Sequence, residues 1–175
     1  MRDFKTSRRA VSCALAVLFA AAAAEAKPWR RVVPLRTTRA EVERRFGKPD
    51  PKSRHYEFRS HRAFVVYAGG DGCAEGSSGW DVPRDTVVQI IVTPKRRLRF
   101  SRLRLDMTKF RKAADPETPA HTLYTNEEDG VTYRVFEGGG EYQGRVLKIQ
   151  YDPAAEDAHL RCPAQSPPPA DPARP

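Results

Sequence analysis

Six short segments of alternating or continuous apolar residues constrain this chain more than any other feature of its sequence. Within residues 86–93, Val88, Ile90 and Val92 fall on one side and the intervening side chains on the other, which is the two-residue period of a β-strand. Short strands with close turns between them predict an antiparallel sheet. The six segments are 56–58, 63–68, 86–93, 121–125, 131–137 and 145–151.

A short helix is predicted ahead of the first strand. Thr38 and Glu41 have the spacing of a capping box, in which each side chain accepts a backbone N–H at the helix start. Val42 and Phe46 lie four residues apart on one face, and Gly47 supplies a stop. The predicted fold class is therefore α+β, with a short helix or helices packed on an antiparallel sheet of about five or six strands.

The second half of the chain repeats this order. Residues 106–112 are predicted to form a brief helical turn capped by Thr108, and residues 121–137 a hairpin that turns at Asp129 and Gly130. The hairpin at 55–67 aligns with the one at 121–133, and the strand at 88–94 aligns with 147–153. Two helix–β–β–β units are thus one possible arrangement of the sheet.

Residues 1–26 have the pattern of a signal peptide. Four basic residues precede an uncharged stretch of 15 residues at 10–24, and Ala24 and Ala26 fit the positions that a signal peptidase reads. As a helix this stretch spans roughly 22 Å, short of the ~30 Å hydrocarbon core of a membrane. The sequence predicts secretion to the periplasm or beyond, with cleavage near Ala26 and no transmembrane segment in the mature chain.

Two cysteines remain after the leader, because Cys13 lies within it. In an exported protein, Cys73 and Cys162 are most simply one disulfide bond. A catalytic thiol at Cys73 is the alternative. The predicted organisation is a single α+β domain over 27–162, followed by a proline-rich and alanine-rich disordered tail at 163–175.

Several landmarks along the ordered part resemble a family of small, uncharacterised secreted bacterial proteins. They are W-R-x-V-V-P-L at 29–35, T-T-R-x-E-V-E at 37–43, F-G-x-P at 46–49, G-W-D-V-P-R-D-T-V at 79–87 and L-R-C at 160–162. The resemblance implies export and carries no catalytic residue with it. The helix and its F-G-x-P end are also similar to the small lipoprotein of the outer-membrane assembly machine and to β-lactamase-inhibitor-protein-like domains. That similarity implies a short helical layer on an antiparallel sheet that binds proteins.

Charge is distributed unevenly along the chain, whose formal net charge is +9. One stretch concentrates cations, and it could attract a polyanionic envelope component, although a solvated connector would have the same composition. Export argues against nucleic acid as a routine partner. The cations of this stretch are Lys95, Arg96, Arg97, Arg99, Arg102 and Arg104.

The sequence offers a possible binding residue in Trp80, which lies in a glycine-rich loop near Cys73. It is either an exposed recognition residue or a lid over a small core. No metal-ligand spacing, cofactor motif or nucleophile motif is present, so no metal or cofactor is predicted. We therefore expect a non-enzymatic interaction module of the envelope or the extracellular space, with an unknown protein or a polyanion as partner. The enzymatic alternative is a secreted hydrolase that assembles its site from residues such as His55, His121 and Asp85.

Overall fold

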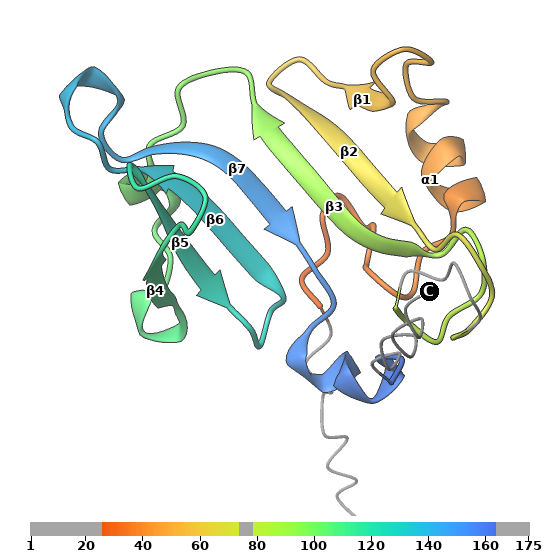
Figure 1. The fold of residues 1–175 in the computed structure, drawn as a ribbon. Coiled ribbons are helices and arrows are strands. Elements are labelled where there is room, and N and C mark those ends of the chain that lie inside the picture. The colour runs from red at the N-terminus through yellow and green to blue at the C-terminus, as the bar shows by residue number, and fades with distance from the viewer. Residues whose placement is uncertain (1–25, 74–78, 164–175) are drawn as a thin grey trace, which may run out of the picture.

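A computed structural model describes residues 26–73 and 79–163; most of the predicted signal peptide and of the predicted tail lies outside them. The chain forms one seven-stranded antiparallel sheet in the order β1-β2-β3-β7-β6-β5-β4 (Figure 1). The pairing of β3 with β7 joins the strands β1–β3 to the strands β4–β7. The strands are β1 (His55–Glu57), β2 (His61–Tyr67), β3 (Val87–Pro94), β4 (Arg111–Ala114), β5 (His121–Asn126), β6 (Val131–Phe136) and β7 (Arg145–Tyr151).

The predicted helix is confirmed as α1 (Arg39–Phe46). Thr38 accepts from the Glu41 N–H and Glu41 accepts from the Thr38 N–H, so the capping box is complete. Gly47 follows with a φ of 77°, and its N–H donates to the Glu43 carbonyl. Val42 is fully buried and anchors the helix to the sheet.

The predicted α+β fold class is wrong, because it overestimates the helical content relative to the strands. Strands dominate, the sheet has seven of them rather than five or six, and α1 is the sole α-helix of the described residues. The helical turn expected at 106–112 is the short 3-10 turn η2 (Met107–Lys109), which Asp106 caps in place of Thr108. The second half therefore does not form a helix–β–β–β unit.

The extra strand, β4, follows that turn and carries the sequence Arg-Lys-Ala-Ala. Apolar and polar residues do not alternate in this sequence, because β4 is an edge strand whose side chains are mostly exposed. Its pairing with β5 holds it in the sheet. A strand that is stabilised by its neighbour more than by its own side chains escapes a pattern-based prediction.

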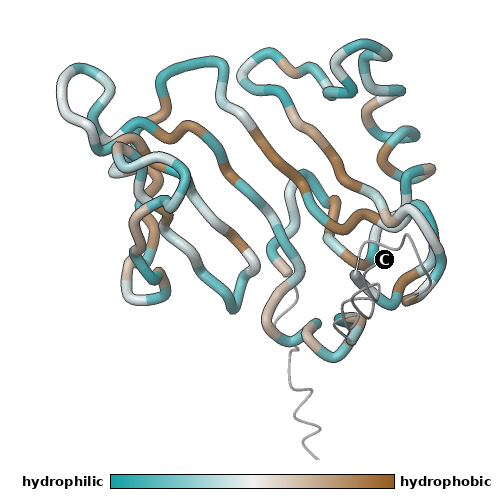
Figure 2. Tube along the Cα trace, viewed as in Figure 1, coloured by the Kyte–Doolittle hydropathy of each residue, from teal (hydrophilic) through white to brown (hydrophobic). Residues whose placement is uncertain are grey.

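One face of the sheet is covered from β1 to β5. Over β1–β3 the cover is α1 together with Trp29 and Val32, and over β5–β7 it is the segment from Leu98 to Phe110. Ile149 and Tyr151 of β7 contact both cores, and burial raises the pKa of Tyr151 to about 12. Figure 2 shows the apolar residues concentrated along the strands, with hydrophilic turns around them.

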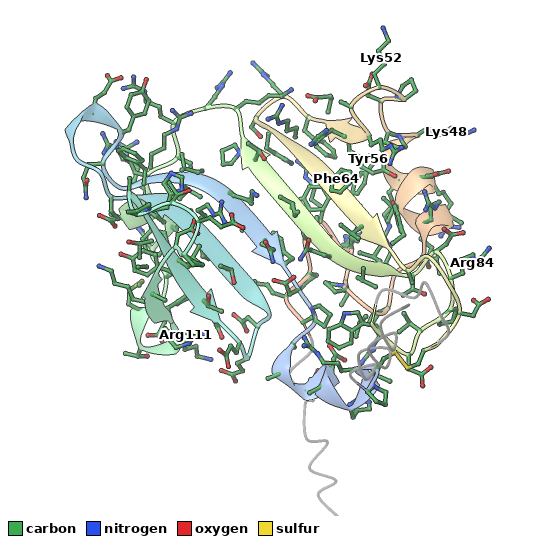
Figure 3. All side chains as sticks on the ribbon, in the orientation of Figure 1. Lys48, Lys52, Tyr56, Phe64, Arg84 and Arg111 are labelled. Carbon is green, nitrogen blue, oxygen red and sulfur yellow. A yellow bond between two sulfur atoms is a disulfide. The ribbon has the colours of Figure 1, made fainter. Side chains whose placement is uncertain are left out.

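The other face is only half buried, at residues such as Phe64 (labelled in Figure 3), Ile91 and Gln150. A third, smaller core closes one end of this face, where Trp80 and Leu160 pack beside Val66 and Val88. Leu160 ends the 3-10 helix η4 (Ala155–Leu160), an element that the sequence did not predict.

The predicted disulfide bond is confirmed. Cys73 and Cys162 are bonded, with their Cα atoms 5.4 Å apart and a sequence separation of 89. The bond ties the end of the described chain to the loop between β2 and β3, next to Trp80.

Candidate functional site

Trp80 is held in place by the C-terminal segment of the domain. It forms an antiparallel bridge with Arg161, and the flanking residues extend the pairing: the Asp81 N–H donates to the Leu160 carbonyl, and the Cys162 N–H to the Gly79 carbonyl. Together with the disulfide, these bonds fix the Trp80 loop against η4.

Two adjoining hollows flank Trp80, with volumes of about 350 and 450 Å³. Both are lined by Trp80, Asp152, Pro153 and Arg161. The Arg161 guanidinium lies over the indole, 4.9 Å from the ring centroid, so a cation–π pair lines both hollows. We call the two hollows together the Trp80 groove.

Two carboxylates line the Trp80 groove: Glu127, which pairs with Arg111, and Asp152, which is surrounded by neutral hydrogen-bonding groups. Asp152 accepts from the Gln89 amide at 2.8 Å and from the Gln150 amide at 2.9 and 3.1 Å. On the neighbouring strands, the Thr132 hydroxyl donates to Thr125 at 3.2 Å. These side chains come from β3, β7, β6 and β5 in spatial order, so they form a polar row across the half-buried face.

The turn between β5 and β6 closes one side of the groove, and it depends on Gly130. The residue has a φ of 64°, as the predicted Asp129–Gly130 turn requires. A Cβ at this position would lie 2.2 Å from the Asp152 carbonyl oxygen. Because only glycine permits this approach, the turn can contact the end of β7 and complete the groove wall.

The acidic residues around the groove are mostly paired with cations. Arg111, Lys109 and Lys27 neutralise the three acids of the turn at distances of 2.9, 3.2 and 3.7 Å. Asp157, whose side chain is 2 % exposed, pairs with Arg36 at 2.8 Å. The groove is therefore close to electrically neutral although acidic side chains surround it. The three acids of the turn are Glu127, Glu128 and Asp129.

The predicted basic stretch does not join Trp80. Lys95 follows the last residue of β3, whereas Trp80 lies beside its first residues, so roughly 25 Å of strand separates them. Lys95 pairs with Glu57, and Arg97 pairs with Glu141 at 3.0 Å.

The other cations of the stretch lie in two different environments. Arg99 donates to the carbonyls of Glu141 and Gln143, and is thereby used to hold a loop. Arg96, Arg102 and Arg104 are exposed, and within residues 26–73 and 79–163 they have no carboxylate at ion-pair distance. Arg102 and Arg104 belong to the 3-10 turn η1 (Phe100–Leu103) and its end, over the covered face.

The residues named for a hydrolase do not converge. His55 lies on β1 and His121 on β5, with four strands between them, and Asp85 pairs with Arg39 at the start of α1. His121 does approach Asp115 at 3.6 Å, but Arg134 lies closer to the same carboxylate oxygen, at 3.0 Å. In the described part of the chain, no three His, Cys, Asp or Glu side chains are grouped closely enough to hold a metal ion.

Arg161, Asp152 and Gln89 are the groove residues that the sequence did not single out. Asp152 is 72 residues from Trp80 and 63 residues from Gln89 along the sequence, and folding brings the three side chains together. The one usable signal was the pair Cys73 and Cys162, since a bond between them places Arg161 near the Trp80 loop.

Comparison with protein-family profiles and with curated protein sequences gives no match. Among solved structures, a cysteine-rich secretory protein from Staphylococcus aureus is similar over 72% of this chain, with 11% sequence identity and a TM-score of 0.30. This chain spans 47% of that protein's length. Within the described residues, no helix has the length and apolar character to cross a membrane.

Proposed function

We propose that this protein is an exported, non-enzymatic binding module that holds a polar ligand in the Trp80 groove. The observation that carries the proposal is that the Trp80–Arg161 pair lines both hollows together with Asp152, which accepts from the amide of Gln89. Concave sites that combine an aromatic side chain with a few placed polar groups are typical of ligand binding. The leader-like sequence at 1–26 and the disulfide support export.

The chemistry of the lining favours a neutral, polyhydroxylated ligand such as an oligosaccharide. Amides, hydroxyls and the carboxylates of Asp152 and Glu127 can exchange hydrogen bonds with hydroxyl groups in many orientations. The surrounding acids are already paired with cations, which leaves little net charge to attract an ion. Trp80 adds apolar area beside these polar groups.

Isothermal titration calorimetry with representative neutral oligosaccharides, such as N-acetylglucosamine oligomers and maltodextrins, tests this proposal. Trp80→Ala should weaken binding by about ten-fold, since a well-packed aromatic contact contributes ~1.5 kcal/mol. Tyr142→Ala, which removes an exposed aromatic ring far from the groove, is the matched control and should bind normally. Equal losses in both variants, or no binding of either sugar class, would contradict the proposal.

A further inference from the structure

The end of the sheet opposite the Trp80 groove gathers cations from three separate segments. The β1–β2 turn, the chain that leaves β3 and the loop between β6 and β7 all lie at this end. His61 pairs with Pro94, the Lys95 N–H donates to the Ser60 carbonyl, and Arg99 forms a bridge with Arg145. We call this surface the basic rim and define it by Arg59, Arg62, Lys95, Arg96, Arg97 and Arg145.

Carboxylates do not neutralise the basic rim. Within residues 57–62, 94–99 and 137–145 there are seven Lys or Arg side chains and three Glu side chains. Glu57 pairs with Lys95, whose hydrogen bond lowers the pKa of that carboxyl, and Glu141 pairs with Arg97, where hydrogen bonds from Tyr142 and then Arg97 lower the pKa. Glu137 accepts from Tyr124 and Gln143.

Three exposed cations of the basic rim have no ion pair in the described part of the chain, although Arg62 lies opposite Glu57 on the neighbouring strand and its charge contributes to lowering the pKa of that carboxyl. Arg59, Arg62 and Arg96 are exposed and have no carboxylate within ion-pair distance among the residues that the structure describes. Lys52 extends at the same end of the molecule, whereas Arg84 and Arg111 lie nearer the other end (Figure 3). The β4–β5 turn, with Asp115 and Glu117, lies at the same end of the sheet but beyond β6, and Arg134 pairs with both of its acids there.

An exposed aromatic ring accompanies these cations. Tyr142 is 42 % exposed, and the guanidinium groups of Arg97 and Arg145 lie 5.2 and 5.4 Å from its ring centroid. Tyrosine is enriched where a protein meets the headgroup region of a membrane, because its ring is apolar and its hydroxyl is polar. A tyrosine flanked by arginines can thus enter an anionic interface while the cations stay with the headgroups.

We propose that the basic rim docks the protein on an anionic phospholipid surface, with the Trp80 groove directed away from it. The rim extends across the ends of the four neighbouring strands β1, β2, β3 and β7, a width of about 15 Å at the usual spacing of strands. A single phosphate could contact only one or two of these side chains, whereas a lipid surface presents many anions at once. A basic residue near such a surface strengthens binding by about five-fold, corresponding to ~1 kcal/mol.

Sedimentation with vesicles tests the proposal directly. The chain starting at Lys27, with its disulfide formed, is mixed with phosphatidylcholine vesicles that contain or lack phosphatidylglycerol. The leader must be absent because an apolar segment could bind lipid by itself. We expect binding only to the anionic vesicles and a steep loss of affinity as salt is raised.

Charge-matched triple variants then separate docking by the rim from attraction by net charge. Arg59→Gln/Arg62→Gln/Arg96→Gln should weaken vesicle binding by roughly 100-fold, from three five-fold steps. The control Arg44→Gln/Arg84→Gln/Lys112→Gln removes the same charge outside the rim and should weaken it only several-fold. Tyr142→Ser should weaken vesicle binding by a further several-fold. Thermal unfolding verifies that each variant is folded.

Two results would overturn the proposal. Equal losses in the two triple variants would mean adsorption by net charge. Stronger binding to a soluble sulfated polysaccharide than to vesicles, with the same dependence on Arg59, Arg62 and Arg96, would mean that the rim recognises an anionic polymer. Neither result would bear on sugar binding at Trp80, because the rim and the groove are tested by different residues and different ligands.

Discussion

The two ends of the sheet use charge in opposite ways. At the groove end, carboxylates are numerous but are paired: Asp157 with Arg36, and the acids of the β5–β6 turn with three separate cations. At the basic rim, the few carboxylates are already engaged and Arg59, Arg62 and Arg96 project without such partners. Paired charges organise structure, whereas unpaired ones remain available to an external partner.

The two ends also differ in how they are held. The groove end has a disulfide, a backbone bridge between Trp80 and Arg161, and a glycine that lets two turns touch. The basic rim consists of turns that carry exposed side chains. We therefore expect substitutions at the groove end to change stability, and substitutions at the rim to change association while leaving stability nearly unchanged.

The largest effect is expected from removing the disulfide at the groove end. Cys73→Ser/Cys162→Ser frees a loop of 89 residues, which should lower the free energy of unfolding by ~4–5 kcal/mol in the chain-entropy estimate. Urea titration followed by circular dichroism measures the change. Unchanged stability would show that η4 and the Trp80 bridge hold this end without the bond.

Asp157 should have the next largest effect. It is buried, accepts from the Ala154 N–H at 3.2 Å and pairs with Arg36, so Asp157→Ala leaves these donors without their acceptor. We expect a loss of ~1.5–3 kcal/mol, the range for hydrogen bonds to charged groups. The control is Glu127→Ala, which breaks the exposed pair with Arg111 and should cost at most ~1 kcal/mol. Equal costs would remove the distinction between structural and solvated pairs at the groove end.

Beneath the rim, His61 should make stability depend on pH. Its ring packs against Trp29 and Phe58, and burial, followed by the charges of Arg30 and Lys95, lowers its pKa. In the unfolded chain the histidine binds a proton near pH 6.5, whereas in the folded chain it binds one only at lower pH. Stability is thus fully present above pH 6.5 and is lost as the pH falls below it.

Denaturant unfolding between pH 7 and 5.5 tests this expectation, because most carboxylates titrate below that window. His61→Gln should flatten the decline, whereas His159→Gln, at an exposed site, should leave it unchanged. An identical decline in all three proteins would exclude His61 as its source.

The smallest effect on stability is expected at the rim itself. Arg59→Gln, Arg62→Gln and Arg96→Gln should each change the free energy of unfolding by less than ~0.5 kcal/mol, because exposed and unpaired side chains contribute little. Differential scanning calorimetry is sufficient to detect a larger change. A loss above 1 kcal/mol in any of them would show that its guanidinium has a structural partner in solution.

Local patterns in the sequence predicted the local structure, and distance along the chain limited the rest. The capping box, the Gly130 turn and the strand at 145–151 depend on neighbouring residues, and all three are confirmed. β4 was missed because pairing with β5 maintains it, and η4 because nothing in its short sequence forms a periodic face.

The candidate site was predictable only in part. Trp80 was singled out by its loop, but its partners Arg161 and Asp152 are contributed by the other end of the chain. The basic stretch was visible as composition, yet composition could not tell Arg99, which holds a loop, from Arg96, which has no such contact. Pairing of charges is a property of the folded chain.

The division of the molecule into a docking end and a ligand end is tested most directly by quenching of Trp80 on vesicles. The chain has two tryptophans, and Trp29 is only 7 % exposed, so acrylamide reports mainly on Trp80, with Trp80→Phe as the reference. If the rim faces the membrane, Trp80 should be quenched equally in the free protein and in the protein bound to phosphatidylglycerol vesicles. Protection of Trp80 on binding would place the groove against the lipid and contradict the account.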